Sequence, residues 1–377
     1  MKLLFDGTAT QGNTVPYHGG ADYAIFVFES ALKSGYRFDI LLCNNLVTNP
    51  RVLAGIKEYS LNVVEVANKK EIYSYLNSDK YDRFFSALPQ QQKQYSMQSV
   101  VVIHGLRGLE LSWDNFYYKY QSSPFKKYVY WLISKNRWIW PLIKRIHYKK
   151  FYNRVHNTNR LITVSTHSKY SIKYFYPDID LKEITVIPSP AKIEKFDRKE
   201  NKYGKYFLMV SGKVPIKNIY RAVKAFDKLF ERGTLTDVKV VITGGAKLPF
   251  MKEIKNKDMF VLLDYVSNQE LENLYANAFV FVYPSLNEGY GYPPVFAMAN
   301  EVPVAASSFS SIPEVCQNAA LYFNPLDEDN IANRIMQLYS DDDLRKKLID
   351  NGRLVSNQII KEQNKNVKKL LRIIFEE

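Results

Sequence analysis

The residues best suited to chemistry lie in a loop that follows an apolar run typical of a buried strand. Residues 287–299 read NEGYGYPPVFAMA and come directly after FVFVYPS. The carboxylate of Glu288 can accept hydrogen bonds from the paired hydroxyl groups of a sugar, and the glycines around Tyr290 let the backbone approach a sugar or phosphate closely. We therefore interpret residues 288–291 as a candidate binding loop for a sugar or a phosphate.

Two lysines occur in a second loop of this kind. The apolar run YFLMV is followed by SGKVPIKN, which contains Lys213 and Lys217 and leads into a predicted helix. Backbone amides and the helix dipole favour negative charge at the start of a helix, so lysines there suit an anion. The alternative is two solvated lysines. Likewise, the glycine pair at 244–245 either approaches a ligand or forms an ordinary turn.

A histidine follows a third apolar run. His104 and Gly105 come directly after SVVVI. A histidine in that position can donate a hydrogen bond or transfer a proton to a ligand. Alternatively, its ring forms a hydrogen bond with a loop carbonyl.

The elements that must position these loops follow an alternating pattern. Strand-like runs alternate with helical patterns, which predicts an α/β fold with two Rossmann-like domains. We expect an N-terminal domain at 1–190, a polar linker at 191–205, a second domain at 206–355 and a C-terminal helix at 356–377 that crosses back to the first domain. Because ligands bind at the carboxyl ends of such strands, we expect the loops to face a cleft between the domains.

Composition excludes several classes of protein. With 46% hydrophobic and 24% charged residues, the chain is globular rather than disordered. Its two cysteines, Cys43 and Cys316, lie in apolar settings and predict buried thiols rather than a disulfide or metal site. No signal peptide and no membrane-spanning run is recognisable, so we expect a cytoplasmic protein. We interpret the acidic runs at 340–346 and 176–180 as a helix cap and a turn, and expect no metal.

Three stretches cover most of the second half and occur in this order within 206–327: YFLMVSGKVPIKNIYRAVKAF, DYVSNQELENLYANAFVFVYPSLNEGYGYPP and VPVAASSFSSIPEVCQNAALYFNPLD. They resemble the retaining glycosyltransferases of family 4, which have the GT-B fold. The first half matches more loosely, through Gly19-Gly20, His104-Gly105 and ITVSTHSKYSI. The resemblance implies a nucleotide-sugar donor, and no cofactor or metal.

The resemblance also implies roles for individual residues. Glu288, His104 and Lys217 would be the catalytic residues, and the loop around Ser311 would be a structural turn. The residues implied to bind the donor are Gly19, Gly20, Lys213, Lys217, Tyr265, Val266, Glu288, Gly289, Tyr290 and Gly291. The lysine loop is about one residue shorter than the usual form. Phe296 stands where the family normally has a second glutamate that binds the ribose.

One segment of the sequence carries most of the net charge of +14. Residues 115–177 contain thirteen lysines and arginines, no acidic residue and many tryptophans and tyrosines. Such a segment suits the surface of an anionic membrane. A helical subdomain with solvated bases is the alternative, and a nucleic-acid surface is a third reading that no accompanying nucleic-acid module supports.

These features together predict a retaining, metal-independent glycosyltransferase. It would move a hexose or deoxyhexose from a nucleotide sugar to a glycan acceptor, expected to be lipid-linked, in surface polysaccharide synthesis. We expect it on the inner face of the cell membrane. The alternative is a catalytically silent GT-B subunit that stabilises or recruits a partner transferase, and Phe296 is the residue that motivates it.

Overall fold

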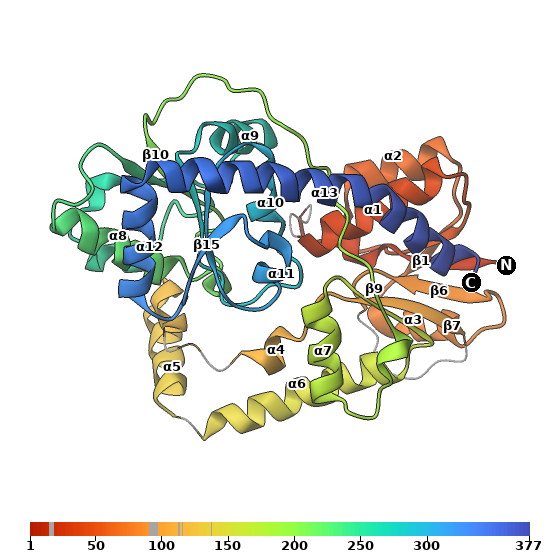
Figure 1. Ribbon diagram of the computed structural model, residues 1–377. Helices are drawn as coiled ribbons and strands as arrows, with labels where there is room; N and C mark the ends of the chain where they lie inside the picture. Colours follow the sequence, from red (N-terminus) through yellow and green to blue (C-terminus); the bar gives the residue numbers. More distant parts are fainter. Residues whose placement is uncertain (15–18, 90–96, 112–113, 115, 137) are drawn as a thin grey trace. The chain divides into compact units, whose positions relative to one another are not determined.

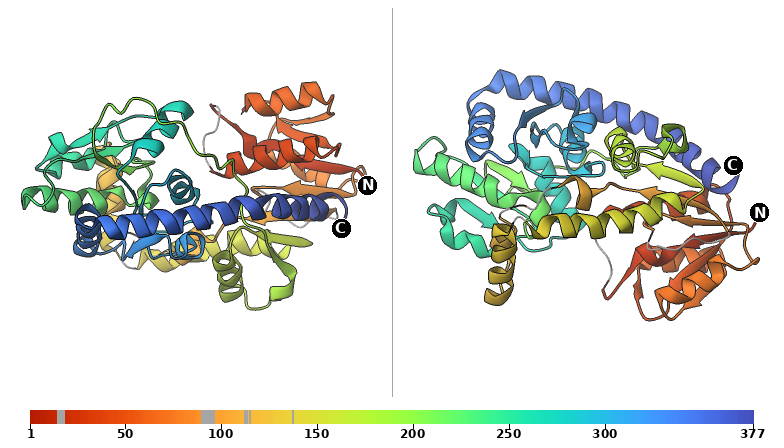
Figure 2. Two further views of the ribbon diagram at one scale, coloured as in Figure 1. Left: turned by 45° about the horizontal axis from the view of Figure 1, so that its top comes forward. Right: turned by 90° about the horizontal axis from the view of Figure 1, so that it is seen from below.

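The computed structural model describes residues 1–377 except 15–18, 90–96, 112–113, 115 and 137 (Figure 1). The chain divides into two compact units. The first unit comprises residues 1–109, 144–192 and 361–377, and the second comprises 110–143 and 193–360. Each unit has its own sheet, flanked by helices (Figure 2).

The first unit contains a seven-stranded sheet with the strand order β5-β3-β1-β6-β7-β8-β9. All neighbouring strands are parallel. The strands are β1 (Leu3–Asp6), β3 (Asp39–Cys43), β5 (Val63–Val66), β6 (Arg83–Ser86), β7 (Gln98–Ile103), β8 (Arg160–Thr163) and β9 (Ile184–Val186), and a separate antiparallel pair is formed by β2 (Gln11–Gly12) and β4 (Val47–Thr48).

Helices connect these strands. They are η1 (Gly7–Thr10), α1 (Gly19–Lys33), α2 (Pro50–Glu58), α3 (Lys69–Leu76), α4 (Arg107–Glu110), α6 (Ile139–His156), α7 (Thr166–Phe175) and η3 (Leu181–Glu183). The last residue of α4 and the first five of α6 group with the second unit.

The second unit contains a six-stranded parallel sheet with the order β12-β11-β10-β13-β14-β15. Its strands are β10 (Tyr206–Met209), β11 (Lys239–Ile242), β12 (Phe260–Leu262), β13 (Val280–Tyr283), β14 (Val304–Ser307) and β15 (Ala320–Phe323). Its helices are η2 (Tyr117–Tyr120), α5 (Pro124–Lys135), η4 (Pro215–Lys217), α8 (Ile219–Glu231), η5 (Pro249–Glu253), η6 (Lys257–Met259), α9 (Asn268–Asn277), α10 (Tyr292–Ala299), α11 (Ile312–Cys316), α12 (Glu328–Ser340) and α13 (Asp342–Phe375).

Both sheets have the Rossmann strand order, so the two predicted Rossmann-like halves are confirmed. In the second sheet, side chains alternate between two buried faces, as a strand period of two requires. Phe207 and Met209 pack towards the cluster that contains residues of α8 and α12, whereas Tyr206 and Leu208 pack towards residues of α9 and α10. Burial on both faces explains why these strands read as continuous apolar runs.

The C-terminal end of α13 belongs to the first unit, which confirms that the last helix crosses back. In Figure 1, α13 is one continuous helix in blue that begins well before residue 356. The buried guanidinium of Arg83 donates to the carbonyls of Ile373 and Ile374 at 3.2 and 3.0 Å. The ring of Phe375 stacks on that of Tyr36 with a centroid distance of 4.2 Å. The two hydrogen bonds from Arg83 satisfy carbonyls at the end of the helix that would otherwise lack partners.

The two acidic runs have structural roles among the described residues. Asp341 accepts a hydrogen bond from the backbone amide of Leu344 at 2.8 Å and thereby caps the start of α13. Asp180 caps η3 in the same way. No helix in the described part of the chain is both long and apolar enough to cross a bilayer.

We expect Asp227 on α8 to make a pH-dependent contribution to the free energy of unfolding. It is 4% exposed and accepts hydrogen bonds from the backbone amides of Lys255 and Asn256 at 3.1 and 2.9 Å. Burial raises the pKa of Asp227, but these hydrogen bonds and that of the Asn256 side chain outweigh it and leave the pKa below its ordinary value. A lowered folded pKa stabilises the protein above the ordinary carboxyl pKa of about 4, and this contribution is lost as the pH falls through the folded value.

We expect Asp227→Asn to lower the free energy of unfolding by about 1.5–3 kcal/mol at pH 7, because charge-assisted hydrogen bonds to buried amides are lost. Urea unfolding at pH 7 and pH 3 measures the effect, which should shrink at the lower pH. Asp258→Asn, at an exposed position, is the matched control. An equal loss at both pH values would contradict the assignment.

Candidate functional site

The second sheet brings two of the predicted loops together. β10 and β13 are neighbours at the point where the strand order reverses, and their carboxyl ends lead into the loops at 210–218 and 284–291. Ligands of open parallel sheets bind at such a switch point. The backbone amide of Leu286 donates to the carbonyl of Ile216 at 2.9 Å, which joins the two loops directly.

Glu288 and Lys217 form an ion pair at this point. The Lys217 ammonium lies 2.7 Å from Oε1 of Glu288 and 3.1 Å from the hydroxyl of Tyr283. The Ser285 hydroxyl donates to the same carboxylate oxygen. Burial raises the pKa of Tyr283, and the adjacent Glu288 carboxylate raises it further, so Tyr283 stays neutral and can donate a hydrogen bond. The result is a largely buried carboxylate and ammonium held in fixed positions.

Two serines hold the backbone around Glu288. The Ser310 hydroxyl accepts from the amide of Glu288 at 2.9 Å, and the Ser311 hydroxyl donates to the carbonyls of Glu288 and Tyr290 at 3.0 and 2.9 Å. Gly291 has a φ of +102°, a conformation that side-chain-bearing residues rarely adopt. Gly289, Tyr290 and Gly291 therefore form a backbone loop of fixed geometry ahead of α10.

Lys213 is placed differently from Lys217. Its ammonium pairs with Asp264, which follows β12, at 3.1 Å, and its side chain is 40% exposed against 16% for Lys217. The hydrogen bond from Lys213 lowers the pKa of Asp264. Tyr265 and Val266 follow directly in the same loop, and Tyr265 is 74% exposed. Both lysines therefore lie in the loop after β10. Lys213 contacts the loop after β12, and Lys217 contacts the loop after β13.

His104, Gly19 and Gly20 belong to the first unit. Gly19 and Gly20 begin α1, and residues 15–18 before them lie outside the described residues. The ring nitrogen Nε2 of His104 lies 2.9 Å from the carbonyl of Ala87, so this nitrogen carries the proton. The edge of the ring contacts Tyr23, with centroids 4.8 Å apart. This hydrogen bond matches the alternative in which the histidine satisfies a loop carbonyl.

Phe296 lies in an aromatic cluster. Its ring centroid is 6.0 Å from those of Tyr275 and Tyr292 and 6.5 Å from that of Phe196. Aromatic rings at these separations stabilise one another by dispersion and by their quadrupoles. The position that holds a glutamate in the resembling family is therefore part of the apolar packing between α9, α10 and the segment at 196.

Three positions at the starts of α8 and α10 offer no free amide to a ligand. α10 has prolines at positions 293 and 294, which carry no N–H, and the amide of Tyr220 at the start of α8 already donates to the Tyr120 hydroxyl at 2.8 Å. An anion bound here would therefore depend strongly on the side chains of Lys217 and Lys213 for its positive partners.

Comparison with known proteins places the second sheet in a known family. Residues 191–355 match the model of the family described as glycosyl transferases group 1. These residues form a group 1 glycosyltransferase domain. The matched range contains β10 to β15, both lysines and Glu288, whereas the loop at His104 lies outside it.

Curated relatives of the chain include mannosyltransferases. O-antigen chain mannosyltransferase RfbU of Salmonella typhimurium is 33% identical over 189 residues, which cover 49% of this chain and 52% of the relative. O-antigen chain mannosyltransferase B of Escherichia coli is 45% identical over 84 residues, which cover 22% of each chain. The chain thus spans about half or less of the length of these relatives.

Solved structures show the same fold. A glycosyltransferase from Rickettsia africae superposes with a TM-score of 0.65 at 16% identity, with 100% of this chain and 99% of that chain covered. At this identity the likeness concerns the fold, which is the GT-B fold of two Rossmann-like halves.

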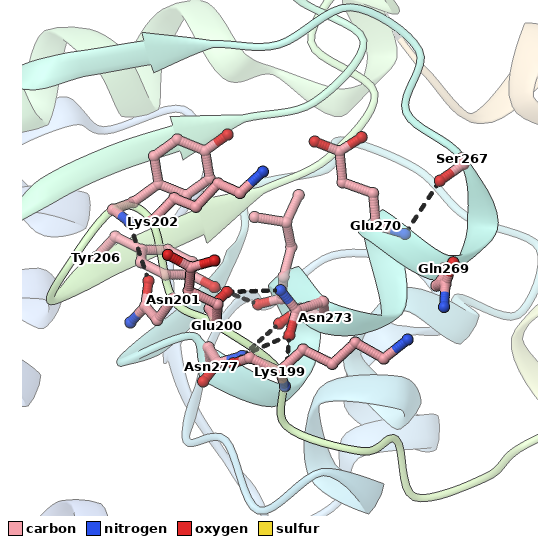
Figure 3. Close-up of a pocket in the computed structure, with 12 residues that line it drawn as sticks. Lys199, Glu200, Asn201, Lys202, Tyr206, Ser267, Gln269, Glu270, Asn273 and Asn277 are labelled. Carbon is pink, nitrogen blue, oxygen red and sulfur yellow. Dashed lines mark hydrogen bonds between the residues drawn. The ribbon is translucent and has the colours of Figure 1, made fainter.

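A separate pocket of the glycosyltransferase domain lies along the predicted linker (Figure 3). The side chain of Asn273 on α9 accepts from the amide of Lys199 at 2.9 Å and donates to the carbonyl of Glu200 at 3.1 Å. Asn277 donates to the carbonyl of Lys199 at 3.3 Å. The side-chain amides of Asn273 and Asn277 thus form hydrogen bonds with the backbone of the linker. We therefore interpret the pocket as the site where the linker packs against α9.

Proposed function

We propose that this protein is a glycosyltransferase of surface polysaccharide synthesis that moves a hexose or deoxyhexose, with mannose the first candidate, from a nucleotide sugar to a glycan acceptor. The observation that carries the proposal is the Lys217–Glu288 pair at the switch point of a group 1 glycosyltransferase domain. Two of the relatives are O-antigen chain mannosyltransferases, which supports the choice of sugar and product.

In the proposed reaction, Glu288 binds hydroxyl groups of the transferred sugar, and Lys217 holds that carboxylate in place. Negative charge develops on the leaving diphosphate, and Lys217 and Lys213 stabilise it, as fixed cationic groups do in other transferases. We infer from this that no metal is needed. Retention of the anomeric configuration is inferred from the resemblance to family 4, and Tyr265, Val266 and the backbone of 289–291 in the same unit are assigned to donor binding on the same basis.

Release of nucleotide from a panel of nucleotide sugars, including GDP-mannose, tests the proposal. We expect turnover with one donor, unchanged by EDTA, and a product whose anomeric proton coupling shows retention. Turnover that requires an added divalent ion would contradict metal independence. The absence of turnover with every donor, together with no nucleotide-dependent rise in melting temperature, would favour the silent subunit instead.

We further propose that the protein binds peripherally to an anionic membrane, on the cytoplasmic side, through the segment 115–177. Large apolar side chains of α5 and α6 are exposed there, including Phe125 at 76%, Trp131 at 39% and Ile146 at 67%. The segment holds thirteen basic residues and no acidic one. Aromatic side chains partition to the bilayer interface, and the basic residues are attracted to anionic lipid. A lipid-linked acceptor would then be reached at the membrane surface.

Flotation with liposomes of anionic lipid and of zwitterionic lipid alone tests the membrane proposal. We expect binding to anionic liposomes that weakens as the salt concentration rises. The variant with Phe125→Ala and Trp131→Ala should bind about tenfold more weakly, because apolar area is withdrawn from the interface. Leu354→Ala, which removes a side chain 68% exposed on α13, is the matched control. Equal binding to both kinds of liposome, or none, would contradict the proposal.

A further inference from the structure

Two acidic residues, Glu110 and Asp114, contact the second loop of the candidate site and the start of α8, which directly follows the first loop. Both residues follow β7 in the sequence but belong to the second unit. The carboxylate of Glu110 accepts a hydrogen bond from the side chain of Asn287, the neighbour of Glu288. Asp114 forms an ion pair with Arg221 in the first turn of α8, four residues after Lys217. Neither contact was expected from the sequence.

The Asp114–Arg221 pair is bidentate and largely buried. The guanidinium nitrogens donate to the two carboxylate oxygens at 2.7 and 3.1 Å, and the side chains are 11% and 8% exposed. The ring of Phe116 lies 4.5 Å from the guanidinium carbon. Removing one partner of such a pair leaves a buried charge without compensation, which is strongly unfavourable. The pair therefore fixes the orientation of the Arg221 side chain.

Arg221 in turn orients Asn218. The guanidinium nitrogen that donates to Asp114 at 3.1 Å also donates to Oδ1 of Asn218 at 2.8 Å. The side-chain amide nitrogen of Asn218 must therefore point away from Arg221. That nitrogen donates to the carbonyls of Pro284 and Pro325 at 3.0 and 2.7 Å. Asn218 is buried and has a φ of +57°, a backbone conformation that is uncommon for a residue with a side chain.

This chain of contacts links the two loops on either side of the ion pair. Asn218 directly follows Lys217, and Pro284 directly precedes Ser285, which donates to the Glu288 carboxylate. The hydrogen bond from Asn218 to the Pro284 carbonyl joins the two loops, and the Lys217 ammonium then lies 2.7 Å from the Glu288 carboxylate.

We propose that Asp114 is a positioning residue of the donor site, which acts through Arg221 and Asn218 to hold the Lys217 loop against the Glu288 loop. The assignment rests on the proposed function, since it is the donor that these loops would bind. Glu110 supports the second loop through Asn287. Glu110 and Asp114 thereby support a site whose other residues lie more than ninety positions later in the chain.

The test replaces Asp114 by asparagine, which keeps the shape and removes the charge. We expect amide hydrogen exchange of residues 217–221 and of Leu286 to become at least tenfold faster, because the contacts through Asn218 loosen. With the donor that the panel identifies, kcat/KM should fall about ten- to hundredfold, since small misplacements of catalytic groups have effects of this size. Arg221→Lys, which cannot contact Asp114 and Asn218 together, should give the same two changes.

Lys228→Met is the matched control, because Lys228 forms another ion pair of α8, with Glu328 at 3.2 Å. It should leave both the exchange of Leu286 and kcat/KM unchanged, whatever its effect on melting temperature. Wild-type exchange in Asp114→Asn, or equal acceleration in Lys228→Met, would overturn the positioning role. The exchange measurement needs no donor, so it decides this inference even where the panel gives no turnover and the proposed function fails.

Discussion

Replacing Glu288 by glutamine is expected to lower kcat/KM for the nucleotide sugar by about 10²- to 10³-fold. The carboxylate is largely buried and receives hydrogen bonds from Lys217 and Ser285, so its position is fixed before the donor binds. Glutamine keeps the size and one acceptor oxygen but loses the charge, and pre-organised charged groups contribute effects of this magnitude in buried sites. Steady-state kinetics of nucleotide release measures the loss.

The control for this variant is Glu301→Gln. Glu301 also pairs with a lysine, Lys195, at 2.9 Å, but its side chain is 36% exposed and it lies after α10 rather than at the switch point. Its replacement should change neither kcat nor KM. Activity of Glu288→Gln within threefold of wild type would remove Glu288 from the catalytic residues. A fall in KM with unchanged kcat would have the same consequence.

The sequence predicted the loops of the second sheet because two signals coincide there. Each loop follows a continuous apolar run, which marks a strand buried on both faces, and each contains glycine or lysine, which suit a sugar or phosphate. The order of a doubly wound sheet then makes the first and fourth strands neighbours. Lys217 and Glu288, 71 residues apart in the chain, could therefore be expected to meet, and they do.

The supports of these loops were not predictable in the same way. Ser285, Ser310 and Ser311 act through single hydroxyl groups on backbone atoms, and serine is common in loops for many reasons. A signal was present only at Ser311, which the family resemblance marks as a structural turn. Asn218 in the left-handed region is a conformational choice that its sequence neighbours leave open.

The segment 110–143 departs most from the sequence ranges. The sequence placed these residues in the first domain, at 1–190, yet Asp114, Lys119 and Tyr120 make their contacts with α8 and η5 of the second unit. Each of these contacts joins residues about a hundred positions or more apart. Local composition does not encode such pairs, because a carboxylate in a loop reads equally well as solvated.

Phe296 stands where the resembling family has a glutamate, and the structure gives its side chain a role in packing. The sequence showed only that a hydrogen-bond acceptor is missing at this position of α10. In the structure the phenyl ring packs with Tyr275, Tyr292 and Phe196, so the side chain has a role in packing. A glutamate introduced here would place a charge against three aromatic rings, which disfavours it. Glu288 and Lys217, which carry the proposed donor site, are both present beside this change.

The two lysines of the β10 loop are expected to differ sharply in their effect on catalysis. Lys217→Met should lower kcat/KM about 10²- to 10³-fold, whereas Lys213→Met should lower it about tenfold. The Lys217 side chain is 16% exposed and that of Lys213 is 40% exposed, so solvent screens the charge of Lys213 more strongly. Methionine keeps the unbranched stem in both variants, and the same assay of nucleotide release compares them.

The double variant Lys217→Met with Glu288→Gln separates the direct action of Lys217 on the diphosphate from its action through Glu288. If Lys217 served only to hold the carboxylate, the double variant would be no slower than Glu288→Gln alone, because residues that act as one unit are not additive. We expect it to be about tenfold slower than that single variant, since the leaving diphosphate loses a cation that Glu288 does not supply. Equal effects of Lys213→Met and Lys217→Met would contradict the assignment, because the contact of Lys217 with Glu288 is what distinguishes the two lysines.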